Sequence, residues 1–177
     1  MLILTGCSTQ SGMVTGATPQ TWAAGPKVPK IIYTSARGQE LDFNKTRYPV
    51  TIVVFSAPKG ENCCWIDPRV ASLWDRLRDL PVTVAQFSLP TRECPHGPGC
   101  VEGCNIRGGL MTICDPDRTA WAAFGRPPIG TMILIERGNQ IAMTGSLQES
   151  QAVVAEARRL GQAETNRRVG ERIEMYK

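Results

Sequence analysis

The chain has 177 residues, of which 42% are hydrophobic and 20% are charged, and its formal net charge is +4. This length builds one domain with a hydrophobic core and gives no reason to expect two. The basic residues are spread along the chain and only 6% of all residues are aromatic, which argues against a nucleic-acid-binding surface. No apolar run has the roughly 18 residues that a membrane-spanning helix needs.

The N-terminal pattern Leu4-Thr5-Gly6-Cys7 is typical of the lipobox of bacterial lipoproteins, in which the cysteine thiol carries the lipid. The few residues before it contain neither a charged n-region nor a full apolar h-region. The pattern is therefore either the end of a signal that continues upstream of Met1 or a chance match. On the first interpretation, Cys7 anchors the protein to a membrane on the periplasmic side of the cell envelope. Residues 1–30 are then a lipobox remnant and a flexible tether, because Ser8–Lys30 is rich in small and polar residues.

A short hairpin and a strand–helix–strand unit follow the tether. The hairpin is predicted at Ile31–Thr34 and Glu40–Phe43. The run Val50–Phe55 is typical of a strand that is buried on both faces of a sheet. Apolar residues then recur at spacings of three and four, which predicts an amphipathic helix over residues 67–80. The next strand is Val82–Phe87, and because no hairpin signal separates the two strands, we expect them to be parallel with a right-handed crossover.

The second half of the domain begins with a segment of unusual composition. Thr91–Gly109 is rich in Gly, Pro and Cys and has no periodicity, so we expect a long functional or disulfide-stapled loop. Leu110–Cys114 then runs into Asp115-Pro116-Asp117, which predicts a turn and a helix cap before a short helix at Thr119–Phe124.

The last elements are a hairpin and a helix. Thr131–Ile135 and Gln140–Met143 flank a Gly-Asn pair, which predicts a hairpin. The final helix carries the apolar residues Val153, Val154, Ala157 and Leu160. A charged helical tail over residues 161–177 follows the main domain, which spans residues 31–160.

One segment resembles the active-site turn of the thioredoxin superfamily, in which a buried strand ends in Phe and a Cys-x-x-Cys turn opens a helix. Its sequence is Phe55-Ser56-Ala57-Pro58-Lys59-Gly60-Glu61-Asn62-Cys63-Cys64-Trp65-Ile66-Asp67-Pro68. Phe55, Ala57, Cys63, Ile66 and Pro68 keep the family's register. Gly60 stands where the family has its attacking cysteine, so the motif reads Gly-x-x-Cys-Cys.

The resemblance covers residues 31–160 and implies a thioredoxin-like α/β fold: a central mixed β-sheet flanked by helices, with the Cys/Pro/Gly-rich loop as an insertion. The Asp-Pro-Asp turn and the short helix after it are similar to the redoxin branch of the superfamily. The implied activity is thiol–disulfide exchange with thiols or disulfides of a partner protein, and no cofactor is expected.

The altered motif leaves several roles open for Cys63 and Cys64. A helix N-terminus lowers a thiol pKa, so Cys63 could be a lone nucleophile that Cys64 or a loop cysteine resolves. The two neighbours could instead form a vicinal disulfide. In a third arrangement one of them is bonded permanently to the loop, because segments that leave neighbouring parallel strands meet at one edge of the sheet.

Seven cysteines favour an oxidising compartment. The candidates for disulfide or resolving cysteines are Cys94, Cys100, Cys104 and Cys114, and the sequence does not choose among their pairings. If all are staples, the protein is a redox-inactive binding or structural module. A third alternative is handling of copper or zinc by the loop, whose weak candidate ligands are Cys94, His96, Cys100 and Cys104. Their spacing matches no recognised metal motif, so no metal site is predicted.

The superfamily's second signature is a cis-proline that precedes the penultimate strand and faces the substrate. By alignment of Leu134-Ile135 with that strand, Gly130-Thr131 stands where Pro-Thr is expected. Either the cis bond lies two or three residues earlier, at Pro127-Pro128, or the chain lacks it. The resemblance therefore places the substrate-facing loop at Pro128, Gly130 and Thr131.

Overall fold

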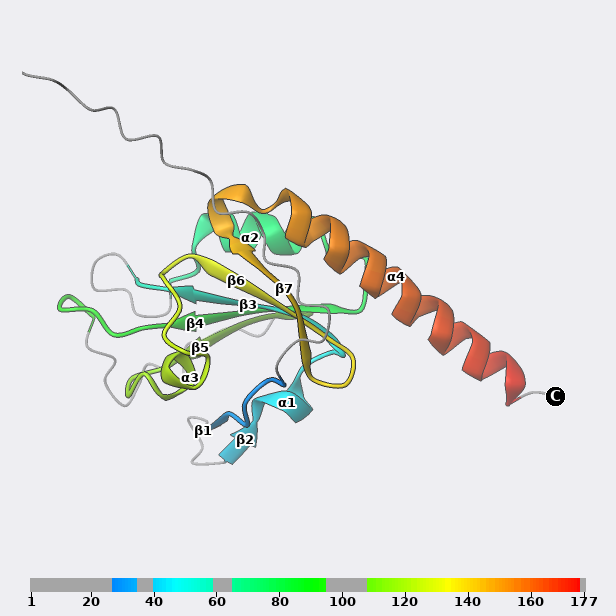
Figure 1. The fold of residues 1–177 in the computed structure, drawn as a ribbon, viewed down its shortest axis with the longest axis horizontal. Coiled ribbons are helices and arrows are strands. Elements are labelled where there is room, and N and C mark those ends of the chain that lie inside the picture. Colours follow the sequence, from blue (N-terminus) through cyan, green and yellow to red (C-terminus); the bar gives the residue numbers. More distant parts are fainter. Residues whose placement is uncertain (1–26, 35–39, 59–64, 95–107, 176–177) are drawn as a thin grey trace, which may run out of the picture.

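A five-stranded sheet with the strand order β5-β4-β3-β6-β7 lies at the centre of the protein (Figure 1). This computed structural model describes residues 27–34, 40–58, 65–94 and 108–175. The sheet strands are β3 (Val50–Ser56), β4 (Val82–Ser88), β5 (Leu110–Cys114), β6 (Thr131–Glu136) and β7 (Gln140–Ser146). β4 pairs in parallel with both β3 and β5, whereas β6 pairs antiparallel with β3 and β7. The sheet is therefore mixed, as predicted.

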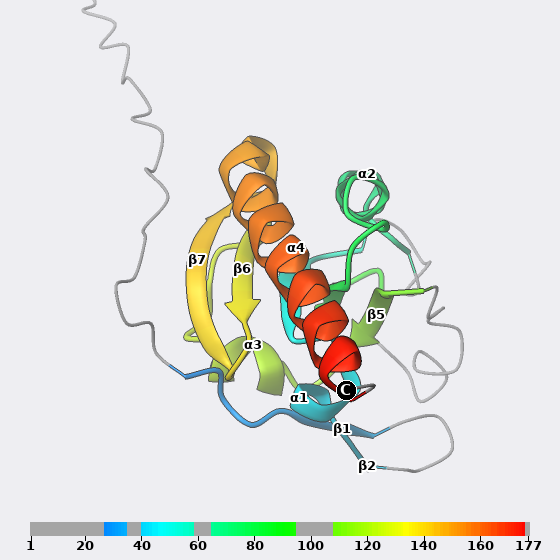
Figure 2. The same cartoon turned by 90° about the vertical axis from the view of Figure 1, so that its right-hand side faces the viewer.

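Helices cover both faces of this sheet (Figure 2). One face packs against α2 (Pro68–Asp75) and α4 (Gln151–Glu174), and its core includes Ile52, Val84 and Leu134. The other face packs against α3 (Thr119–Ala123) and α1 (Phe43–Thr46). A two-stranded hairpin, β1 (Ile32–Thr34) with β2 (Glu40–Asp42), precedes α1. A 3-10 turn, η1 (Leu147–Glu149), joins β7 to α4.

Three phenylalanines pack against one another on the sheet face that is covered by α1 and α3. The ring centroid of Phe87 on β4 lies 5.2 Å from that of Phe43 and 5.6 Å from that of Phe55. All three side chains are buried. Burial of a side chain of this size contributes about 1.5–3 kcal/mol, so this cluster anchors the α1 segment to the strand that leads into the predicted active-site turn.

The helix predicted over residues 67–80 is shorter than expected. α2 ends at Asp75, because the Leu77 and Leu80 amides donate to carbonyls three residues earlier, at Trp74 and Leu77, and tighten the chain into turns. Leu77 is nonetheless fully buried and Leu80 packs against the same core. The apolar periodicity therefore identified the buried face correctly but not the last helical residue.

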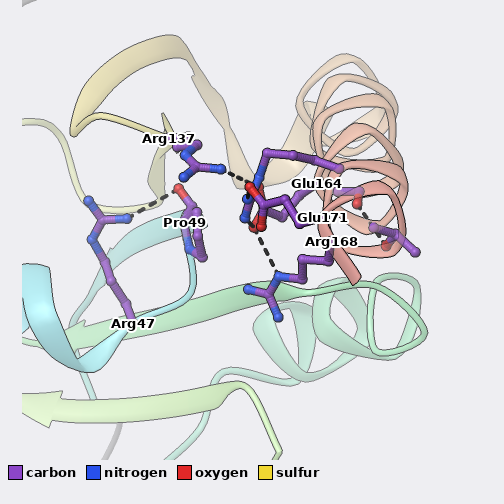
Figure 3. A network of polar contacts seen from close by, with 9 residues as sticks. Arg47, Pro49, Arg137, Glu164, Arg168 and Glu171 are labelled. Carbon is purple, nitrogen blue, oxygen red and sulfur yellow. Dashed lines mark hydrogen bonds and ion pairs between the residues drawn. The ribbon is translucent and has the colours of Figure 1, made fainter. Parts of the chain in front are cut away.

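The final helix, α4, continues to Glu174 and extends past the sheet (Figure 1). A buried carboxylate helps to hold it (Figure 3): Glu164 accepts from Arg167, Arg168 and Arg137. The closest of these contacts is 2.6 Å, between Arg167 Nη2 and Glu164 Oε1. These hydrogen bonds, led by that from Arg167, lower the pKa of Glu164 to about 2.

Another arginine in Figure 3, Arg47, contacts the β6–β7 turn through Asn139. Arg47 donates to the carbonyl oxygens of Tyr48 and Pro49 and to the side chains of Thr51 and Asn139. Burial lowers the pKa of this guanidinium to about 10. Among residues whose structure is described, no helix is long and apolar enough to cross a bilayer.

Candidate active site at the carboxyl edge of the sheet

Three neighbouring strands end side by side at one edge of the sheet. Ser56 of β3 pairs with Ser88 of β4, and Ser88 pairs with Cys114 of β5. The residues that follow β4 and β5 continue the ladder, because Leu89 N–H donates to Ser56 O at 2.8 Å and Asp115 N–H donates to Ser88 O at 3.0 Å. The segments that follow the three strands therefore start within two strand spacings, about 10 Å, of one another.

Several predicted site residues fall outside the described parts of the chain: Cys63, Cys64, Cys100, Cys104, His96 and Cys7. The described residues on either side of the Cys63-Cys64 pair are well anchored. Ala57 and Pro58 follow β3 directly, and Trp65–Asp67 lead into α2. The geometry of these flanks determines where the dicysteine segment begins and ends.

A buried glutamine holds the downstream flank. Gln86, in the middle of β4, is fully buried. Its Nε2 donates to Trp65 O at 2.8 Å, and its Oε1 accepts from Asp67 N–H at 3.0 Å. Both polar ends of the carboxamide are therefore satisfied by main-chain groups just before α2, which fixes the start of the helix to the sheet.

Asp67 begins α2 and is itself almost completely buried. Its carboxylate accepts from the Arg69 amide at 2.9 Å and forms an ion pair of 2.6 Å with the Arg69 guanidinium. Pro68 takes the first helical position, where a missing N–H costs nothing. The hydrogen bond to Asp67 raises the pKa of Arg69. The helix thus starts at a defined residue, with Asp67 as its N-cap.

Two of the predicted cysteines are placed at this edge. Cys94 and Cys114 are both disulfide-bonded. Cys94 is fully buried and Cys114 is 6% exposed. A local turn fixes Cys94, because its N–H donates to Thr91 Oγ1 at 3.0 Å and its carbonyl accepts from Thr91 N–H at 2.9 Å. Cys114 is therefore the last residue of β5, and Cys94 lies in a local turn of the segment that follows β4.

The predicted substrate-facing loop approaches the same edge. Gly130 N–H donates to Phe55 O at 2.8 Å, and Trp121 Nε1 donates to Pro127 O at 2.7 Å. Ile129 between them is 54% exposed. The described peptide bonds are all trans. Of the two alternatives that the sequence left open, the loop therefore has the one without a cis bond at Pro127-Pro128.

Comparison with solved structures identifies the architecture. A secreted thiol-disulfide isomerase from Corynebacterium glutamicum is 19% identical, with a TM-score of 0.60 over 89% of this chain and 99% of that chain. A putative protein disulfide isomerase from Bacteroides thetaiotaomicron is 16% identical, with a TM-score of 0.56 over 78% and 90%. A DsbF homologue from Corynebacterium diphtheriae is 13% identical, with a TM-score of 0.55 over 85% and 99%.

The chain has a thioredoxin fold. No protein-family model matches the sequence, and no curated protein matches it either. The resemblance that the sequence showed at residues 55–68 is thus confirmed at the level of the fold.

Within this thioredoxin fold, the sequence did not single out the buried polar residues of β4 and β5. Gln86, Ser88 and Thr112 interrupt strands that are buried throughout. A polar side chain in such an apolar strand indicates a structural or functional role, because its burial costs free energy unless a hydrogen-bond partner compensates. In the described ranges, no group of His, Cys, Asp or Glu residues could hold a metal ion.

Proposed function

We propose that the chain is a thiol–disulfide redox protein of the cell envelope, with Cys63 as the reacting thiol and a non-standard Gly-x-x-Cys-Cys site. The observation that carries this proposal is the shared edge of β3, β4 and β5. The segment with Cys63 and Cys64 leaves β3 there, and the disulfide-bonded Cys94 and Cys114 follow β4 and end β5. The same segment ends where the capped helix α2 begins, which supports a reactive thiol in it.

The proposed exchange starts with the Cys63 thiolate. It attacks one sulfur of a disulfide in a partner protein, a mixed disulfide forms, and the partner's other sulfur leaves as a thiolate. Cys64 or a loop cysteine then attacks the mixed disulfide, which releases the reduced partner and leaves a disulfide in this chain. Because Gly60 replaces the usual first cysteine, the resolving thiol cannot come from a Cys-x-x-Cys pair.

Pro128, Gly130 and Thr131 form the proposed substrate-facing surface. Three hydrogen bonds fix this loop: Gly130 N–H to Phe55 O, Leu147 N–H to Gly130 O at 2.7 Å, and Thr131 N–H to Pro128 O at 3.0 Å. Ile129 is more than half exposed beside it, so a partner chain would meet an apolar side chain here.

Location in the cell envelope belongs to the same proposal. The protein from Corynebacterium glutamicum is described as secreted, and disulfide chemistry is typical of oxidising compartments. Lipidation of Cys7 would add a membrane anchor.

A redox-inactive binding or structural module is the second candidate. It is favoured by the burial of Cys94 and Cys114, because inaccessible disulfides resist reduction and stabilise a fold. The two candidates differ in whether any disulfide opens under mild reduction.

Insulin reduction in the presence of dithiothreitol tests the proposal. We expect the wild-type protein to accelerate insulin precipitation and Cys63→Ser to remove most of that acceleration. Cys7→Ser is the matched control, since it removes a thiol far from the site in sequence and should leave the rate unchanged. A wild-type protein without activity, or a Cys63→Ser variant with full activity, would contradict the role of Cys63.

A further inference from the structure

The end of α4 carries two exposed apolar side chains, Val169 and Ile173. They are four residues apart and each is 54% exposed. Side chains at this spacing are neighbours on one side of a helix. The helix continues past the sheet here (Figure 1), and neither residue belongs to the core that the first half of α4 covers. The packing of this domain therefore does not account for the apolar pair.

The two side chains border a groove between α4 and the segment before β4, which we call the α4 groove. Its volume is about 530 Å³, and its other lining residues are Pro81, Thr165, Arg168 and Arg172. This volume lies within the range of about 300–1,000 Å³ that is typical of binding clefts. Pro81 directly precedes β4, so the groove lies at the amino edge of the sheet. β4 has seven residues, so about 20 Å separates the groove from the carboxyl edge.

Two arginines give the α4 groove a positive charge. Arg168 is already partly compensated, because its Nε donates to Glu164 Oε1 at 2.9 Å and its guanidinium lies over the ring of Tyr48. Arg172 is exposed, and within the described ranges its guanidinium has no hydrogen bond or ion pair. A ligand that enters the groove therefore meets an apolar pair with an uncompensated cation beside it.

The acidic residues of this helix end lie on another side of it. At 3.6 residues per turn, three glutamates are roughly 100° or more away from both Val169 and Ile173; they are Glu164, Glu171 and Glu174. A symmetric dimer brings the same patch of two copies together. A second copy of this chain would therefore offer Arg172 another arginine and no carboxylate. The charge favours a partner that supplies acidic groups of its own.

Ion pairs keep this helix end helical beyond the core. Arg167 pairs with Glu164 three residues earlier and with Glu171 four residues later. Arg137, between β6 and β7, pairs with Glu164 and ties the helix to the sheet. A surface that is already ordered loses little conformational entropy on binding. The α4 groove is therefore preorganised for a partner.

We infer that the α4 groove binds an acidic, amphipathic helix of a partner protein. An apolar side chain of that helix packs between Val169 and Ile173, and a neighbouring carboxylate pairs with Arg172. A helix suits this surface because the side chains of two helices interlock along such a pair. The groove lies at the edge of the sheet opposite the proposed redox site, so a bound partner leaves the carboxyl edge open. This inference does not rest on the proposed function.

A designed peptide tests this inference. The probe is a fluorescein-labelled peptide of about 18 residues, long enough to form a helix, with Leu at every third or fourth position and Glu at flanking positions. Fluorescence anisotropy measures its affinity for the full chain, and amide NMR spectra of the labelled chain locate the contact. We expect saturable binding that weakens at high salt and shifts the Val169, Arg172 and Ile173 amides. The same peptide with Lys in place of Glu should not bind.

Two variants and a matched control assign the contact to the α4 groove. Arg172→Glu should weaken peptide binding by about tenfold or more, because attraction becomes repulsion. Ile173→Ser should also weaken it by about tenfold, because the apolar contact is lost. Arg126→Glu reverses an exposed arginine of the α3–β6 loop and should leave the affinity unchanged. No binding by wild type, full affinity of Arg172→Glu, or equal weakening by Arg126→Glu would overturn the inference.

Other occupants of the α4 groove give different results. A sedimentation coefficient that rises with concentration in wild type but not in Ile173→Ser would assign the groove to a second copy. Co-sedimentation with phosphatidylglycerol vesicles that Arg172→Glu abolishes would assign it to a membrane surface. Either result without peptide binding overturns the inference. Arg172→Glu should leave insulin reduction unchanged, so failure of this inference and failure of the proposed function are observed separately.

Discussion

The carboxamide of Gln86 holds the main chain of Trp65, so a residue in the centre of β4 fixes the segment that leads from the dicysteine pair into α2. The same side chain also accepts from the Asp67 amide. Because its Cα partner on β3 is Val54, this carboxamide lies beside an apolar side chain of that strand. The start of α2 is therefore anchored to the sheet by two hydrogen bonds from one buried side chain.

Replacement of Gln86 by leucine tests this anchor. The variant leaves the partly buried Trp65 carbonyl and the buried Asp67 amide without their Gln86 partner, so we expect a loss of about 2–4 kcal/mol in the free energy of unfolding, measured with urea. Hydrogen exchange of the Asp67 amide should accelerate more than that of the Val84 amide, which lies on the same strand as Gln86 but bonds to Gly109 O. Equal acceleration at both amides would show that Gln86 has no local role.

The sequence indicated most of the architecture because the strands are strongly apolar. Val50–Ser56 is buried at every position, and the parallel pairing with Val82–Ser88 follows from the helix between them. In contrast, period-two alternation gives no information about faces in a strand that is buried on both sides. The role of Gln86 is therefore visible only in its hydrogen bonds with Asp67 and Trp65, which lie 19 and 21 residues earlier in the chain.

Asp115 shows a similar limit. The Asp-Pro-Asp turn predicted a helix cap. The N-cap position of α3 is Arg118, which makes no side-chain capping bond, and the Asp115 carboxylate instead accepts from the Ala120 and Trp121 amides at 3.1 and 2.9 Å. Composition alone could not show which of Asp115 and Asp117 makes these hydrogen bonds.

The cysteine pairing could not be predicted from the sequence either, because it depends on loop geometry and not on any local pattern.

Removal of the Asp115 carboxylate gives a second prediction. Asp115→Ala should lower the free energy of unfolding by about 1–2 kcal/mol, because two amides of α3 lose their acceptor. Asp117→Ala is the matched control: its side chain is exposed, so its loss should cost less than about 0.5 kcal/mol. Urea denaturation of both variants compares them directly, and equal losses would contradict the role of Asp115.

The buried carboxylate of Glu164 gives a third prediction, on pH dependence. Its pKa is about 2 in the folded protein, against an ordinary value of 4.5. The folded state therefore binds a proton on the Glu164 carboxylate more weakly than the unfolded state does. The stability that the ionised carboxylate contributes is present above pH 4.5 and lost as the pH falls towards 2. The difference corresponds to about 3 kcal/mol. Denaturation of wild type and Glu164→Gln from pH 7 to pH 2.5 should show their stabilities converging as the pH falls.

A fourth prediction concerns the proposed substrate-facing loop. Gly130 has a φ of 86°, and nothing lies within 4 Å of a Cβ built there. Gly130→Ala should therefore cost about 1 kcal/mol through backbone strain alone. Gly170→Ala, in α4 and equally open, should instead stabilise the protein by about 0.5–1 kcal/mol. Thermal unfolding should therefore show a lower melting temperature for Gly130→Ala and a higher one for Gly170→Ala, each relative to wild type. Changes of the same sign would contradict the loop conformation.

Reactive sulfur chemistry at the carboxyl edge of β3, β4 and β5 is the basis of the proposed function. A redox titration of the full chain in dithiothreitol buffers, with each cysteine followed by differential alkylation and mass spectrometry, tests it most directly. We expect Cys63 to change between the oxidised and reduced states over the titration, together with a resolving cysteine. If Cys63 and Cys64 stay unchanged across the whole range, the site is not a redox centre.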